Sequence, residues 1–393
     1  MPLPRVHRCL LPFVLLFALA SCRSLSLKTS EPVGPGAPVA VFTPHEQYAY
    51  RIPALLATPQ GALLAFAERR IGLGDHAQND IVLRRSLDSG RTWLDEQMID
   101  DRGGDSLNDP CAVVERKSGR VFLMYVRYPK GFHSDRSAGT QQAEFGYDGP
   151  RNTQVFLRSS DDAGATWSEP LDLTRIARRA DVISTGSPGV GIQLTHGPHQ
   201  GRLLFPLYET LGGGKWRNAA LYSDDAGQTW RLSERVPIPN GMSGNGNEAQ
   251  IVELSDGAVL LNARNEGGPR VRMVTRSRDG GQTWDVLREE PDLPTVACMG
   301  SLLRLPKTGL WFSDTPPALL CSLPGAGGRR NGTLHVSRDD GQTWTTKKTL
   351  YPGGFAYSCL ALLPDGRVGC LFEPENYRNI SLLTFDAAWA TQP

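Results

Sequence analysis

Short apolar runs separated by turn-forming residues occupy most of this chain. The segments 80–85, 153–158 and 333–336 are rich in Val, Leu, Ile, Phe and Thr and are too short for stable helices. Turn sequences such as Ser255-Asp256-Gly257 and Pro364-Asp365-Gly366 lie between apolar residues and predict β-hairpins. Since no long segment has a convincing helical period, the pattern predicts an all-β fold.

One motif, Ser-x-Asp-x-Gly-x-x-Trp, is repeated along the chain at intervals that average about 63 residues. A long and regular period indicates an array of supersecondary units, and a unit of this length holds four short strands. Dividing the segment 40–393 by this period gives about 5.6 units. We therefore predict a six-bladed β-propeller with four-stranded antiparallel blades, one of which lacks the motif. The five copies start at Ser86, Ser160, Ser223, Ser277 and Ser337 and end at Trp93, Trp167, Trp230, Trp284 and Trp344.

The residue types in the motif suit a structural turn. Asp and Ser side chains cap backbone amides, Gly allows a positive φ, and Trp anchors the hairpin in apolar packing. The pattern is the Asp-box, and it resembles the repeat of sialidase-type propellers. Because Asp-boxes also occur in non-enzymatic propellers and in other glycosidases, the motif defines the fold better than the function, and we expect its five aspartates to be structural.

The charge balance limits the partners of the chain. The sequence has 42 basic and 41 acidic residues, a net charge of +1, and 40% hydrophobic residues. A large folded core is expected, whereas a broad nucleic-acid-binding face is not. A local basic pocket for a small anion remains compatible with this balance.

The N-terminus has the features of an export signal. A basic start precedes an apolar run, 9–20, that is too short to span a bilayer. Leu19-Ala20-Ser21-Cys22 resembles a bacterial lipobox, which would make Cys22 the lipidated residue; the alternative is an ordinary signal peptide with an incidental cysteine. We expect a signal peptide over 1–22, a flexible tether over 23–40 and the propeller catalytic domain over 41–393. The protein would then be exported and lipid-anchored at the outer membrane or cell surface, or otherwise secreted.

The remaining cysteines do not indicate a metal site. There is no Cys-x-x-Cys pair, so neither a zinc nor a thioredoxin-like site is expected, and no cofactor is implied. Cys359 and Cys370 flank the Pro364-Asp365-Gly366 turn, where they could form a disulfide or remain as buried free thiols.

A second motif strengthens the resemblance. Tyr50-Arg51-Ile52-Pro53 resembles the Arg-Ile-Pro motif that opens the propeller of lysosomal-type and bacterial exo-sialidases, and together with the Asp-boxes the resemblance covers about 40–393. That family binds the carboxylate of sialic acid with three arginines, which stay charged and offer forked donors.

The resemblance assigns these arginines to positions in this chain. Arg51 and Arg264 match the first two; for the third, Arg329 and Arg330 are both possible, and the register favours Arg329. Arg70 resembles a further substrate-binding arginine. For each of them the alternative is a surface ion pair.

The resemblance also implies the reacting groups. Asp75 matches the acid that protonates the leaving group, with Asp80 as its competitor. Tyr357 matches the nucleophile and Glu248 its base, although the family often has Asp where this chain has Asn247. A neutral phenol is suited to attack an anomeric centre that already bears a carboxylate, and sialidases use it in place of a second carboxylate.

Two further carboxylates complete the set. Glu373 resembles the group that orients the first arginine. Asp109, in Asn108-Asp109-Pro110, could line the pocket or shape a turn, and we leave it out of the catalytic set.

The implied function is that of a retaining exo-α-sialidase that hydrolyses terminal sialic acid from glycoproteins, glycolipids and oligosaccharides. The substrate partners would be sialylated glycoconjugates, with no nucleic acid and no membrane contact beyond the lipid anchor, and the protein would be a monomer. The alternatives are a non-catalytic Asp-box propeller that binds sialylated glycans, a trans-sialidase, or a glycosidase specific for deaminoneuraminic acid (KDN).

Overall fold

The computed structural model describes residues 1–2, 31–134, 139–306 and 317–392. The chain divides into the units Met1–Pro32 and Val33–Pro393, and only the second is considered further. The predicted lipidation residue, Cys22, and the apolar run before it lie outside the described residues. Within the described ranges, no helix has the length and apolar character needed to cross a membrane.

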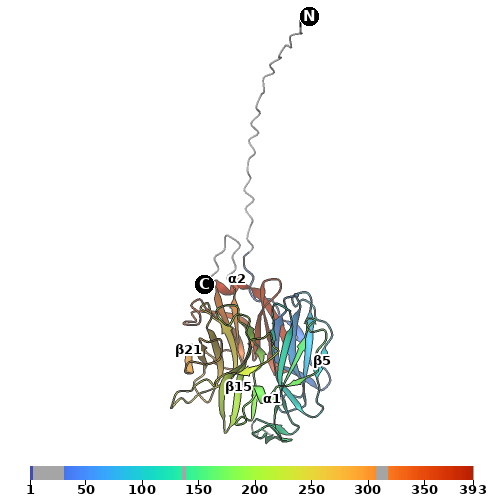
Figure 1. The fold of residues 1–393 in the computed structure, drawn as a ribbon, viewed down its shortest axis with the longest axis vertical. Helices are drawn as coiled ribbons and strands as arrows, with labels where there is room; N and C mark the ends of the chain where they lie inside the picture. Colours follow the sequence, from blue (N-terminus) through green and yellow to red (C-terminus); the bar gives the residue numbers. More distant parts are fainter. Residues whose placement is uncertain (3–30, 135–138, 307–316, 393) are drawn as a thin grey trace. The chain divides into compact units, whose positions relative to one another are not determined.

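The folded unit is all-β, as the apolar pattern predicts. Its described helical elements are α1 (Thr174–Ala177), α2 (Ala387–Thr391) and a 3₁₀ turn at Glu375–Tyr377. Figure 1 shows α1 and α2 near opposite ends of the sheets.

Four sheets consist of antiparallel strands. Each has four strands on its main path, and one carries an additional short strand. These sheets are β1 (Val39–Phe42), β28 (Ile380–Asp386), β27 (Arg367–Phe372) and β26 (Ser358–Leu362); β12 (Ser184–Gly186), β15 (Leu203–Gly212), β16 (Lys215–Ser223) and β17 (Arg231–Leu232), with β14 (Ile192–Gln193) beside β15; β18 (Asn245–Glu253), β19 (Val259–Glu266), β20 (Val271–Ser277) and β21 (Arg288–Pro294); and β22 (Ser301–Leu305), β23 (Ala318–Leu323), β24 (Arg330–Ser337) and β25 (Thr346–Gly354).

A fifth, nine-stranded sheet contains most of the N-terminal strands. One residue pair, Asn79 with Ser106, joins its two halves. A separate two-stranded parallel sheet is formed by β8 (Phe132–His133) and β9 (Gln141–Gln142). The nine-stranded sheet has the order β11 (Leu171–Asp172), β10 (Gln154–Ser160), β7 (Val121–Tyr128), β6 (Ser106–Val114), β4 (Asn79–Ser86), β3 (Leu63–Ile71) and β2 (Tyr48–Ala57), with β5 (Gln97–Asp100) on β4 and β13 (Gly189–Val190) on β6.

The sheets are arranged as in a β-propeller. Going along the chain, β2 contacts β6, β6 contacts β15, β15 contacts β18, β18 contacts β22, β22 contacts β26, and β26 returns to β2. These strands therefore form a closed inner circle. The ring is sealed where β1, from the start of the unit, pairs with β28 from its end, with Val39 opposite Leu382.

The five Asp-boxes form the same turn. In every copy the Ser hydroxyl donates to the Asp carboxylate at 2.7–2.8 Å and accepts the Gly amide at 2.7–2.9 Å. The sequence interpretation missed one member, a Thr before each Trp, whose hydroxyl donates to the second carboxylate oxygen at 2.6–2.7 Å. These threonines are Thr92, Thr166, Thr229, Thr283 and Thr343.

The motif glycine also sets the contact between neighbouring sheets. Gly227 has a φ of 85°, and a Cβ there would lie 2.1 Å from the Phe122 ring on β7 of the preceding sheet. A Cβ at Gly90 would lie 2.4 Å from Leu382 on β28. Glycine is thus required both by the backbone conformation and by close packing.

The cysteines of the described residues are buried free thiols. Cys359 lies opposite Leu371 and Cys370 opposite Leu360, so the two side chains point to opposite faces of the sheet. They belong to different core clusters, which rules out the disulfide alternative.

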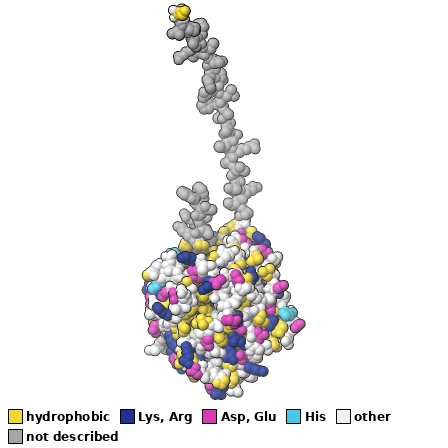
Figure 2. All heavy atoms as spheres, turned by 45° about the vertical axis from the view of Figure 1, so that its right-hand side comes forward, with side chains coloured by type: hydrophobic (Ala, Val, Ile, Leu, Met, Phe, Trp, Pro, Cys, Tyr) yellow, Lys and Arg dark blue, Asp and Glu magenta, His cyan; other side chains and the backbone are white. Residues whose placement is uncertain are grey.

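The surface agrees with the balanced composition. Figure 2 shows basic and acidic side chains interspersed over the face that it presents.

Candidate active site

One cavity of about 270 Å³ gathers most of the sequence-predicted site residues. Asp75, Arg70, Glu248, Arg264 and Tyr357 all line it, and none of the Asp-box aspartates does. The remaining lining residues are Ile52, Asn108, Asp109, Tyr128, His133, Ser134, Tyr208, Trp216, Asn247 and Glu266.

Backbone irregularities in three inner strands turn side chains into this cavity. The strand register shifts between Arg51 and Ala54 in β2, between Asn108 and Cys111 in β6, and between Gly246 and Ala249 in β18. Ile52 and Asp109 both have a φ of 59°, and each precedes a proline, which has no amide to donate to the ladder. The cavity residues Ile52, Asp109 and Glu248 all lie within these bulges.

Arg51 is held by a bidentate ion pair. Its Nε and Nη2 donate to the two carboxylate oxygens of Glu373, each at 3.0 Å, and Glu373 is fully buried. Glu373 also accepts the amides of Ile52 at 2.9 Å and of Tyr357 at 3.3 Å. The structure therefore brings together Arg51 and the carboxylate predicted to orient it. The guanidinium carbon of Arg51 lies 5.3 Å from the Tyr357 ring centre.

The Tyr357 hydroxyl is the centre of a buried polar cluster. It donates a short hydrogen bond to Glu248 and accepts one from Arg264 at 2.9 Å; Arg264 also donates to Glu248 at 3.0 Å. Burial, and then the Glu248 carboxylate, raise the pKa of Tyr357 well above its usual value. The phenol is therefore protonated at rest and has an adjacent carboxylate to receive its proton.

Asp75 lies at the mouth of the cavity. Its side chain is 60% exposed, yet its carboxylate accepts a 2.6 Å hydrogen bond from Arg70 and lies 3.7 Å from Arg51. Burial alone would raise the pKa of Asp75, but Arg70, Arg51 and, more weakly, His133 lower it to about 2. Asp80, the competitor, is the second residue of β4 and pairs with Arg69 outside the cavity.

The two candidates for the third arginine lie in different environments. The guanidinium of Arg329 lies 5.4 Å from the ring centre of Tyr357 and 5.8 Å from that of Tyr377, and it donates a hydrogen bond to the Ala297 carbonyl at 3.3 Å. Arg330 is exposed at the start of β24. The geometry therefore favours Arg329, as does the register. Tyr377, which also lies 5.5 Å from the Arg51 guanidinium, was missed by sequence reasoning.

A buried acidic pair lies beneath the cavity. The Asp109 carboxyl accepts the Tyr208 hydroxyl at 2.5 Å, and the Asp109 amide donates to Glu68 at 2.7 Å. Burial, followed by the charges of Glu68 and Glu248, raises the pKa of Asp109 well above its usual value. Asp109 thus lines the pocket and shapes a bulge at once. Asn108-Asp109-Pro110 resembles Arg51-Ile52-Pro53 in that the bulge residue precedes a proline. This likeness was the sequence feature that could have identified Asp109 as a site residue.

Aromatic and imidazole rings also line the cavity. They are Tyr128, His133, Tyr208 and Trp216. Trp216 follows a turn in which Gly212, Gly213 and Gly214 all have positive φ. None of these rings was predicted, because they belong to strands β7, β8, β15 and β16 but lie outside the repeated motif.

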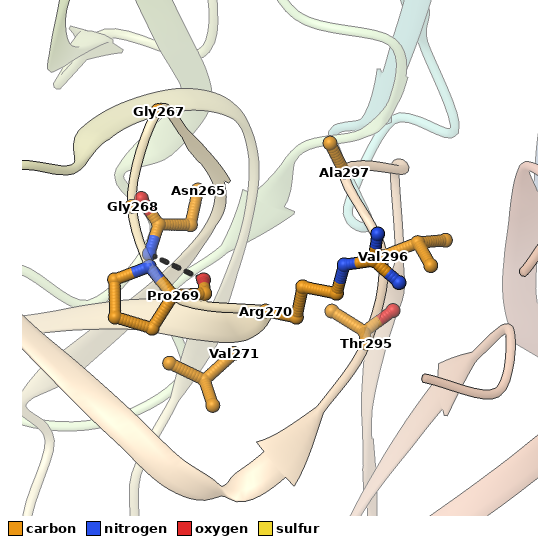
Figure 3. A pocket seen from close by; sticks show the side chains of 9 residues that line it. All are labelled: Asn265, Gly267, Gly268, Pro269, Arg270, Val271, Thr295, Val296 and Ala297. Carbon is orange, nitrogen blue, oxygen red and sulfur yellow. Dashed lines mark hydrogen bonds between the residues drawn. The ribbon is translucent and has the colours of Figure 1, made fainter. Parts of the chain in front are cut away.

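A second cavity of about 220 Å³ lies on the other side of the β19 end (Figure 3). Alternate residues of β19 divide between the two: Arg264 and Glu266 line the first, and Asn265 lines the second. Its other walls are formed by 267–271 and 295–297, with Arg270 extending toward Val296. Since its lining contains no carboxylate and none of the predicted site residues, the first cavity is the candidate active site.

The described part of the chain contains no group of three or more His, Cys, Asp or Glu side chains placed to hold a metal ion.

Comparisons with known proteins agree with the architecture. Residues 46–370 match the family described as BNR repeat-like domain. The chain is 35% identical over 355 residues to a sialidase of Micromonospora viridifaciens, covering 86% of this chain and 52% of that protein. It is 29% identical over 360 residues to a sialidase of Bacteroides fragilis, covering 86% and 62%. The chain thus spans about half to three-fifths of the length of these two relatives. A solved structure, the Hadza microbial sialidase Hz136, superposes with a TM-score of 0.74 at 28% identity over 87% of this chain and 66% of that one.

Proposed function

Because this chain belongs to the sialidase family with BNR repeats, we propose that it is a retaining exo-α-sialidase that hydrolyses terminal sialic acid from glycoconjugates. The observation that carries the proposal is the Tyr357 hydroxyl, which donates to Glu248 and accepts from Arg264 beside the guanidinium groups of Arg51 and Arg329. A module that only binds sugars needs arginines for the carboxylate, but it does not need a phenol paired with a buried base.

In the first step the substrate carboxylate is bound by Arg51, Arg264 and Arg329. The Tyr357 oxygen attacks the anomeric carbon while Glu248 takes the phenol proton. The glycosidic bond breaks, and its oxygen leaves with a proton from Asp75. In the second step Asp75 takes a proton from water, the water oxygen attacks the anomeric carbon, and Tyr357 leaves and recovers its proton from Glu248. Two displacements at one carbon retain the configuration.

To act as an acid, Asp75 must have a higher pKa when the substrate is bound than in the free enzyme. With a pKa of about 2, Asp75 is ionised at neutral pH in the free enzyme. A bound carboxylate would neutralise part of the charge of Arg51 and place a negative charge nearby, and both effects raise the pKa of Asp75. Binding of the substrate and uptake of the proton would thus be coupled.

We also propose that the nine-stranded sheet is two blades, which brings the total to six. Its pairings divide into β2-β3-β4-β5 and β6-β7-β10-β11, and the single pair Asn79–Ser106 joins them. The blade that starts with β26 would be the one without an Asp-box, because all five motifs precede it.

The proposed activity can be measured directly. Protein lacking 1–22 should release free sialic acid from an aryl sialoside without added cofactor, and NMR should detect the α-anomer first. A folded sample that binds sialosides but turns over none of the α2,3-, α2,6- and α2,8-linked substrates would instead be a binding module. A 2,7-anhydro product would indicate an intramolecular trans-sialidase.

We further propose that Cys22 carries a lipid that anchors the protein at the cell envelope. The support is the sequence Leu19-Ala20-Ser21-Cys22 after an apolar run. Several acyl chains are needed for a stable anchor, so the mature protein should partition into detergent. Mass spectrometry of the mature N-terminus should detect an acylated Cys22; an unmodified N-terminus beyond this position would contradict the proposal.

A further inference from the structure

One buried arginine near the active site is bound to uncharged oxygens. The side chain of Arg272, on β20, is fully buried and lines neither of the two cavities. Its Nε donates to the Asn262 side chain at 2.6 Å, its Nη1 to the Cys298 carbonyl at 2.7 Å and its Nη2 to the Asn262 carbonyl at 3.3 Å. No carboxylate of the described residues forms a hydrogen bond or ion pair with it. The guanidinium therefore joins β19, through Asn262, to the segment that contains Cys298.

The charge of Arg272 makes a role in packing alone a poor explanation. Burial lowers the pKa of Arg272 to about 10, so the side chain is still charged at neutral pH. Glu248 and Arg264 are close enough to affect this pKa, but they act in opposite directions. An apolar side chain of similar length would avoid the desolvation of a charge. It would lack the rigid fork of donors, which is the feature of arginine that reaches two segments at once.

The segment that Arg272 reaches is 295–299, which connects β21 to β22. It contains no helix or strand, so no ladder of backbone hydrogen bonds supports it. Figure 3 shows its first three residues beside the second cavity, so open space adjoins part of the segment. At its end, a Cβ on Gly300 would lie 2.4 Å from Leu323 and 3.6 Å from the Arg272 guanidinium carbon, which shows that the backbone packs closely on this arginine.

The same segment contacts two residues of the active site. The Ala297 carbonyl accepts the hydrogen bond of Arg329 at 3.3 Å. Cys298 and Met299 pack in one apolar cluster with Tyr357. A shift of the segment would therefore reach both the third arginine and the predicted nucleophile.

We propose that Arg272 is a positioning residue: through the Cys298 carbonyl it holds segment 295–299, and this segment holds Arg329 in place for the substrate carboxylate. The inference rests on the proposed sialidase function, in which Arg329 is the third arginine. Arg272 itself does not touch the substrate, since it lines neither cavity. Its effect on carboxylate binding therefore passes through the segment and should disappear when Arg329 is absent.

The first test replaces Arg272 with methionine, which has a similar length but no charge and no donor. Arg272→Met should raise the Kd of an unsaturated sialic-acid analogue, measured by direct titration, by about tenfold, within the range of coupling between residues that share partners. KM for an aryl sialoside should rise in parallel while kcat falls less than about threefold, because the carboxylate is bound in the ground state and in the transition state alike. A loss of kcat with an unchanged KM would indicate only a smaller folded fraction and would contradict the proposal.

A double-mutant cycle with Arg329→Ala decides how Arg272 acts. In the Arg329→Ala background, Arg272→Met should change the Kd less than about twofold, because the arginine that it positions is gone. Additive losses would show that Arg272 acts on the ligand independently of Arg329, for example through its charge, and would overturn the positioning role. Arg272→Lys keeps the charge and one donor, so it should raise the Kd only about threefold, and only when Arg329 is present. This variant takes the place of Arg272→Met in the cycle if the methionine variant does not fold.

Arg202→Met is the matched control. Arg202 is a buried arginine that donates to Asp224 and to the carbonyls of Asp279 and Gly280 in an Asp-box, and it lines neither cavity. Its replacement should lower the thermal unfolding temperature and leave the Kd of the analogue unchanged. A comparable rise of the Kd in this control would show that loss of any buried arginine weakens binding, and would also overturn the proposal. If the unaltered protein does not bind the analogue at all, the proposed function is contradicted instead.

Discussion

Replacing Tyr357 with phenylalanine should lower kcat on the order of 10³-fold or more, because the change removes the attacking oxygen. The fold should persist, since the ring would still pack against Ile52, Cys298 and Met299. Kinetics on an aryl sialoside and thermal unfolding of the same sample measure the two effects. Tyr222→Phe is the matched control, because Tyr222 is a buried tyrosine on β16 outside the cavity.

Covalent trapping can identify Tyr357 as the nucleophile. A fluorinated sialosyl fluoride should trap a covalent adduct, and peptide mapping should place it on Tyr357. An adduct on a carboxylate, or the β-anomer as first product, would contradict a tyrosine nucleophile even in an active sialidase. Glu248→Gln should slow adduct formation, because the phenol would lose the group that takes its proton.

Replacing Arg329 with alanine should weaken binding of sialosides and of an unsaturated sialic-acid analogue by about 30-fold or more. The loss of one partner of a desolvated charge pair costs about 2–5 kcal/mol. Arg329 is the most informative of the three arginines because it donates a hydrogen bond to a carbonyl, whereas Arg51→Ala would leave the buried Glu373 without its ion-pair partner. Stability should thus change little.

Arg330→Ala provides the control on the neighbouring residue. Arg330 is exposed, so its removal should leave the inhibition constant of the unsaturated analogue nearly unchanged. The reverse result, a damaging Arg330→Ala beside a mild Arg329→Ala, would show that the register of the third arginine is wrong.

The sequence was informative wherever a residue repeats or belongs to a recognisable motif. Segment 80–85 lies in β4, segment 333–336 lies in β24, and Pro364-Asp365-Gly366 joins β26 to β27. Gly227 could be predicted to need a positive φ, but its contact with Phe122 depends on how neighbouring sheets pack. The threonine before each tryptophan was visible in all five copies, and only the hydrogen bonds revealed its purpose.

The active-site residues were predictable only where they belong to a motif that resembles the family pattern. Arg51 and Glu373 are 322 residues apart in the chain, and only the resemblance, not any local pattern, suggested that they meet. The rings of His133 and Trp216, on β8 and β16, gave no signal because they belong to no recognisable motif and reach the cavity only through tertiary packing. Asp109 was left out of the predicted catalytic set because Asn108-Asp109-Pro110 could equally shape a turn, and its hydrogen bond with Tyr208, which joins two different sheets, leaves no trace in the local sequence.

The seam between β1 and β28 has a consequence for biosynthesis. Val39 emerges from the ribosome more than three hundred residues before its partner, Leu382. Until β28 is made, β1 has no partner strand, and pairing over so long a separation is slow. A nascent chain therefore cannot complete the circle, and a product that stops before Ile380 would expose the edges of β1 and β27 to aggregation.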